Sequence, residues 1–124
     1  SLYRHRRQKM SNPKRGELKI ALGKKTHKGK VTLDVVMRIE QSCGKGIVQI
    51  AQSLQAGELT TSQMVAILTP VIKAGGNDVD EKAVGEMLWH SGLAEGMRVI
   101  AEVVSAVLTS GGDEGNENEA ERLV

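Results

Sequence analysis

The sequence predicts a mostly α-helical protein of the α+β class, with a short N-terminal β-hairpin followed by about five short helices around one aliphatic core. The chain has 124 residues, a length typical of one domain. Hydrophobic residues make up 40% of it, yet Phe is absent and Tyr and Trp occur once each, so the core must be aliphatic. These apolar residues recur at helical spacing through most of the chain.

Basic residues are concentrated at the start of the chain and acidic residues in the rest of it, especially at its end. Residues 1–30 hold eleven Lys or Arg against one acid, whereas the remaining chain holds six basic and fourteen acidic residues. Residues 1–15 are basic without an apolar period and are expected to form a disordered arm, and residues 113–124 an acidic disordered tail. Residues 16–112 are then the single folded domain. The sequence at Met10 is typical of a native start, so residues 1–9 are interpreted as an addition to the native chain.

The first element of this domain is predicted to be a strand over residues 17–23. Leu18, Ile20 and Leu22 alternate with other residues, which is the period of a half-buried strand. A turn through Lys24 and Lys25 then returns the chain as a partner strand over residues 26–31.

Five helices follow, each with an apolar stripe, and most lie between a capping signal and a glycine stop. The clearest start is Thr60 to Gln63, a capping box in which each side chain accepts a hydrogen bond from a backbone amide. Pro70 lies inside that helix and predicts a kink. The expected helices run from Leu33 to Gly44, from Ile47 to Gly57, from Thr60 to Gly75, from Asp78 to Ser91, and from Leu93 to about Thr109, with stops at Gly111 and Gly112.

Reactive side chains show no catalytic or metal-binding pattern. Cys43 is the single cysteine and shares its predicted helix face with Leu33 and Ile39, so we interpret it as a packing residue. His5, His27 and His90 lack the spacing of a helical metal site. No cofactor and no enzymatic activity are predicted. An enzyme would need a pocket where Cys43, Glu86 and His90 converge.

The sequence also bears on where the protein works. A lone cysteine allows no internal disulfide, which favours a reducing compartment. No run of about 18 apolar residues is present, so no membrane span is predicted. The cytoplasm is the expected location.

Three features are candidates for binding a partner macromolecule. Binding would use either the unpaired edges of the hairpin, which can accept another strand, or a groove between helices. Trp89 either anchors a partner or covers the edge of the core, and we favour the second interpretation because tryptophan is usually mostly buried. The partner-binding candidates are Leu18, Ile20, Lys24, Lys25 and Trp89.

The order of motifs resembles the small gene-transfer-agent and prophage tail proteins that are grouped with tail assembly chaperones. The resemblance covers residues 16–108 and rests on the strand 16–23, the segment 54–68, Lys73-Ala74-Gly75-Gly76 and Ser91-Gly92-Leu93. It implies a protein that holds the tape-measure protein or tail-tube subunits during assembly of a phage-like tail. It implies no functional residue, because the shared motifs are structural.

We therefore expect a non-enzymatic tail assembly chaperone or adaptor that binds the tape-measure or tail-tube protein, in the host cytoplasm or on the virion. The alternative is a small nucleic-acid-binding module that uses its basic N-terminal arm to neutralise phosphates. Aromatic residues for base stacking are absent from that region apart from Tyr3, and no helix there is predicted to enter a groove.

Overall fold

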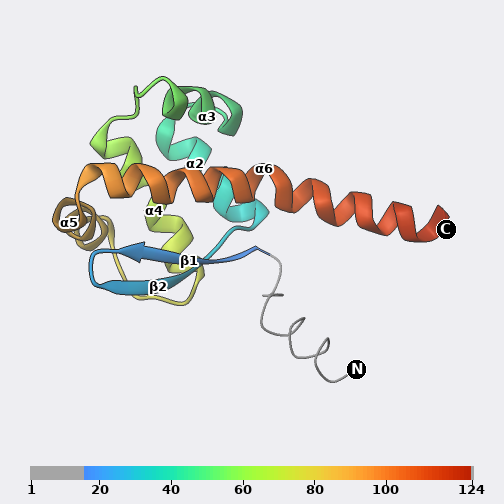
Figure 1. The fold of residues 1–124 in the computed structure, drawn as a ribbon, viewed down its shortest axis with the longest axis horizontal. Helices are drawn as coiled ribbons and strands as arrows, with labels where there is room; N and C mark the ends of the chain where they lie inside the picture. The colour runs from blue at the N-terminus through green and yellow to red at the C-terminus, as the bar shows by residue number, and fades with distance from the viewer. Residues whose placement is uncertain (1–15, 124) are drawn as a thin grey trace.

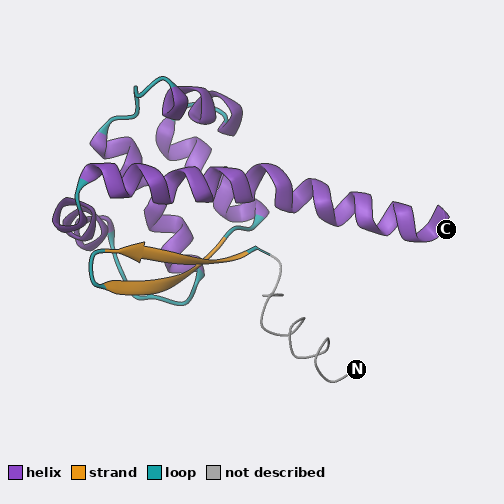
Figure 2. Ribbon diagram, viewed as in Figure 1, coloured by secondary structure: helices purple, strands orange, loops and turns teal. Residues whose placement is uncertain are grey.

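A computed structural model of the chain describes residues 16–110 in full and residues 111–123 as helical backbone. Its elements within this part are the strands β1 (Glu17–Leu22) and β2 (Lys25–Lys30) and the helices α2 (Leu33–Cys43), α3 (Ile47–Gln55), α4 (Thr61–Ala74), α5 (Glu81–Ser91) and α6 (Leu93–Leu123). Figure 2 shows one hairpin among helices. The predicted α+β fold class, with a hairpin followed by five helices, is confirmed. The expected basic arm, residues 1–15, lies outside the described residues.

The hairpin packs one face against the helices. In its antiparallel register Ile20 lies opposite His27 and Leu22 opposite Lys25. Ile20 and Leu22 are buried in the core, as the period of two predicted. Gly23 begins the turn with φ of 69°, a conformation that glycine adopts without strain.

Helix α4 lies at the centre of the molecule, where it contacts β2, α2, α5 and α6. Figure 1 shows α6 crossing the body and continuing past it towards the C-terminus. The shared core is aliphatic, as the composition predicted, and the largest contribution comes from one face of α4: Met64, Ile67, Leu68, Val71 and Ile72.

The C-terminal end of α4 approaches β2 closely because two glycines face each other. A Cβ on Gly75 would overlap the carbonyl oxygen of Lys28, and a Cβ on Gly29 would lie 2.9 Å from Cγ1 of Val71. The Asn77 side-chain amide donates hydrogen bonds to the carbonyl oxygens of Lys28, at 2.7 Å, and Ile72, at 3.0 Å. The hairpin is thereby tied to the end of α4.

Side-chain caps mark the starts of α2, α4 and α5. Thr32 accepts from the Val35 amide at 3.2 Å, and Thr60 and Gln63 form the predicted capping box. Helix α5 begins at Glu81, with Asp80 as its cap and not Asp78: Asp80 accepts from the Ala83 amide at 2.9 Å.

Two helices differ from the prediction or test it only in part. Helix α6 continues to Leu123, so the expected end at Gly111 and Gly112 is wrong. A glycine inside a helix costs only about 1 kcal/mol, which is a weak stop when the helix is otherwise favoured. The disorder expected of residues 113–124 stays a prediction. Pro70 lies within α4, which runs unbroken from Thr61 to Ala74, and the kink likewise stays a prediction.

Candidate interaction surfaces

The side chains with reactive potential are scattered over the described part of the chain. Among residues 16–110 no group of three or more His, Cys, Asp or Glu is placed to hold a metal ion. His27, His90 and Glu86 line one shallow pocket of about 410 Å³ beside the hairpin turn, and Cys43 is not among its lining residues. Of the three side chains considered for an enzyme, only Glu86 and His90 therefore line the same pocket.

Cys43 lies half-buried against the core. Its Sγ is 3.9 Å from the carbonyl oxygen of Gln63, at the start of α4. Burial raises the pKa of the Cys43 thiol, and the nearby Lys45 ammonium opposes this only partly. A raised pKa disfavours the thiolate that nucleophilic chemistry requires, which agrees with a packing role.

The hairpin carries four of the five predicted partner-binding residues, but it exposes them unequally. Ile20 is 1% exposed, so it belongs to the core and is out of reach of a partner in this conformation. Leu18 is half-buried, whereas Lys24 and Lys25 are exposed at the turn.

The outward face of the hairpin is basic. Lys19 and Lys28 lie directly opposite each other, and Lys30 lies opposite Glu17. Lys19 and Lys28 are exposed, and none of the lysines in residues 16–30 forms an ion pair within the fully described part of the chain. Lys25 lies opposite Leu22 and so belongs to the other side of the hairpin, but it is exposed beside Lys24 at the turn. We call the basic hairpin face the outward-facing Lys19, Lys28 and Lys30 together with Lys24 and Lys25 at the turn.

Trp89 is 73% exposed near the end of α5, so the interpretation that it covers the edge of the core is wrong. The inward stripe of α5 is made instead by Val84 and Leu88, and Trp89, one position after Leu88, turns outward. Leu93, at the start of α6, is also exposed, at 38%. We call Trp89 and Leu93 the apolar corner.

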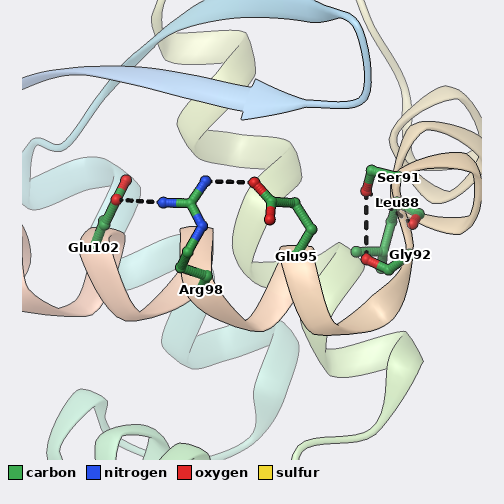
Figure 3. Close-up of polar contacts among 6 residues, drawn as sticks. All are labelled: Leu88, Ser91, Gly92, Glu95, Arg98 and Glu102. Carbon is green, nitrogen blue, oxygen red and sulfur yellow. Dashed lines mark hydrogen bonds and ion pairs between the residues drawn. The ribbon is translucent and has the colours of Figure 1, made fainter.

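The bend between α5 and α6 holds this corner in place. Gly92 adopts φ of 95°, and the Ser91 hydroxyl donates to the carbonyl oxygen of Leu88 at 3.1 Å (Figure 3). Trp89 and Leu93 are therefore presented on either side of a defined turn.

A short ladder of charges follows the bend on α6. Figure 3 shows Arg98 between Glu95 and Glu102, with 2.9 Å between Arg98 Nη1 and Glu102 Oε2. The hydrogen bond from Arg98 lowers the pKa of Glu95, and the same contact raises the pKa of Arg98. All three side chains face solvent, so the ladder supports the start of α6 without forming a reactive site.

A groove of about 810 Å³ separates α2 from α4 and the start of α5. Met37 and Pro70 line it together with Ala66, whose carbonyl receives no hydrogen bond from Pro70 because proline has no N–H. Its rim carries both signs of charge: Asp34, Arg38, Lys73, Asp80, Glu81 and Lys82.

Leu33 lies on α2 one turn before Met37, and it is 75% exposed. The sequence placed Leu33 on the inward face of this helix, and that is wrong. Val35 and Ile39 are the buried residues of α2, which rotates the inward stripe away from Leu33.

Comparison with known proteins assigns the chain to a family. Searches of curated proteins and of solved structures gave no match. None of the described helices combines the length and apolar character needed to cross a membrane. The model of a family described as "Phage tail tube protein, GTA-gp10" matches residues 15–110, which is most of the chain. The protein therefore belongs to this family of phage tail proteins.

Proposed function

We propose that this phage tail protein acts as a tail assembly chaperone or adaptor that holds the tape-measure protein or tail-tube subunits. Membership of a structural tail family supports a role in the tail, and the exposed Trp89 supports binding of a protein partner. The work would take place in the host cytoplasm during assembly, or on the particle itself.

The apolar corner is the observation that carries this proposal. An exposed indole costs solubility and contributes nothing to the core, whereas in an interface tryptophan is among the residues whose truncation costs most. Trp89 offers a large exposed ring with an N–H donor, and Leu93 is a second exposed apolar side chain on the other side of the bend. A partner segment with one apolar side chain and a nearby carbonyl or carboxylate oxygen would cover the apolar surface and accept a hydrogen bond from the indole N–H.

The groove beside α2 is a second surface that an extended or helical segment could occupy. Its lining contains no aromatic side chain and its rim is charged with both signs, which favours weak and adjustable contacts. We therefore assign the main contact to the apolar corner.

Binding of the purified chain to the tape-measure and tail-tube proteins from the same gene cluster tests the role. Isothermal titration should give binding to one of them, and Trp89→Ala should weaken it by about tenfold or more. Val48→Ala is the matched control, because Val48 is also an exposed apolar residue, at 58%, but lies on α3.

The melting temperature should change little in either variant, since neither side chain belongs to the core. Absence of binding to both partner proteins would refute the proposed role. Binding that Trp89→Ala leaves unchanged would refute the assignment of the apolar corner.

A further inference from the structure

We propose that the basic hairpin face binds the acidic C-terminal segment, residues 113–121, of a second copy of this chain, so that copies associate head to tail. This inference goes beyond the proposed function and does not depend on it. It needs no tape-measure or tail-tube protein.

The charge on the hairpin is not explained by folding. Lys19 and Lys28 are cross-strand neighbours on the outward face, and like charges at such positions destabilise a hairpin. Residues 17–30 contain five lysines and one acid, Glu17. Within the fully described part of the chain no carboxylate pairs with any of these lysines, so the face repels itself until an anionic group covers it.

The occupant of complementary charge is in the same sequence. Residues 113–121 contain five carboxylates and no basic residue. Asp113, Glu117 and Glu121 follow at intervals of four, and like charges at that spacing destabilise an isolated helix. Contact with lysines would relieve the repulsion on both surfaces at once.

The positions of the basic hairpin face and the acidic segment favour contact between two copies of the chain over contact within one copy. The hairpin turn lies beside α5, since Gly23, Lys24 and Lys25 share a pocket with Ala83, Glu86 and His90. The acidic segment lies at the opposite end of the molecule, because α6 carries it past the body (Figure 1). A rise of 1.5 Å per residue places Leu123 about 20 Å beyond residue 110.

Contacts between different surfaces of identical chains generate rings or open filaments, unless two copies exchange their segments reciprocally and close into a two-fold dimer. In either case the mean mass of the associated species should grow with concentration. Such a contact is electrostatic and exposed, so it should weaken as salt shortens the range of the charges.

Sedimentation velocity of the full chain alone tests this. We expect concentration-dependent association at about 50 mM NaCl and its loss at about 500 mM NaCl. The variant Lys24→Glu/Lys25→Glu should weaken association by about tenfold or more, and so should Glu117→Lys/Glu121→Lys. Lys73→Glu/Lys82→Glu is the control for the first variant: it changes the net charge by the same amount as Lys24→Glu/Lys25→Glu, but at exposed sites beside the groove on α4 and α5, and should associate like the parent.

The decisive sample is the mixture of the two charge-reversed variants. Each then offers the surface that the other lacks, so the mixture should associate more strongly than either variant alone.

A chain that stays monomeric at low salt overturns the inference, as does a mixture that fails to associate. A third result would also overturn it: Lys24→Glu/Lys25→Glu abolishes a gel shift with duplex DNA but leaves self-association intact. That result would assign the basic hairpin face to nucleic acid.

Discussion

Replacing Gly75 by alanine should loosen the hairpin from α4, although the backbone there suits alanine. Gly75 has φ of −78° and ψ of 0°, which any residue adopts. The obstacle is space: a Cβ at this position would overlap the Lys28 carbonyl oxygen and lie 2.5 Å from its carbonyl carbon. Since carbon atoms pack at about 3.5 Å or more, β2 would have to move by about 1 Å.

The size of the effect follows from three contributions. Overpacking against backbone that cannot change rotamer costs about 1–3 kcal/mol. Displacement of Lys28 strains its hydrogen bond from Asn77, which is 2.7 Å long and contributes about 1 kcal/mol. Alanine lowers the conformational entropy of the unfolded chain relative to glycine, which favours the folded state by about 0.4–1 kcal/mol. The net loss is about 2 kcal/mol, which for a domain of this size lowers the melting temperature by roughly 10 °C.

Thermal unfolding followed by circular dichroism measures this loss, and Gly85→Ala is the matched control. A Cβ on Gly85 would meet only Cγ2 of Val65, at an ordinary 3.7 Å, inside α5. That substitution should stabilise the protein by about 0.5–1 kcal/mol. If Gly75→Ala melted at or above the temperature of the parent chain, the close approach of α4 and β2 would be refuted.

Three further outcomes are expected. Asn77→Ala should lower the free energy of unfolding by about 1–2 kcal/mol, measured as a lower urea midpoint, because two carbonyl acceptors lose their donor. Cys43 should react with iodoacetamide more slowly than free cysteine at neutral pH, followed by mass spectrometry, because burial raises its pKa; an equal rate would contradict this. The lowered pKa of Glu95 means that its stabilising effect is present above the usual pKa of glutamate and is lost as the pH falls through the lowered value. Melting temperatures of Arg98→Ala and the parent should therefore converge in acid, by a small amount because the pair is exposed.

The elements that the sequence predicted correctly depend on local interactions. A capping box such as Thr60 with Gln63 is satisfied within one turn, so its geometry follows from the spacing alone. The hairpin likewise followed from the alternation of Ile20 and Leu22 with Lys19 and Ala21. Neither needs knowledge of the rest of the fold.

The errors concern residues at the margin of an apolar stripe. Leu33 and Trp89 each lie within about one helical turn of buried residues, and whether such a position is covered depends on where the neighbouring helix crosses. The sequence pattern alone does not predict where neighbouring helices cross. The close approach of Gly29 and Gly75 was missed for the same reason, since it joins positions 46 residues apart in the chain.

The basic hairpin face and the apolar corner differ in how strictly folding determines them. The register of the hairpin is set by the burial of Ile20 and Leu22, and a slip by one residue would turn Lys19 and Lys28 into the core. The outward position of these lysines is therefore a consequence of folding, and only their number and lack of partners among the described residues call for a function. Trp89 is different, because a polar residue at its exposed position would fold equally well. Its presence there is the stronger argument for a partner protein.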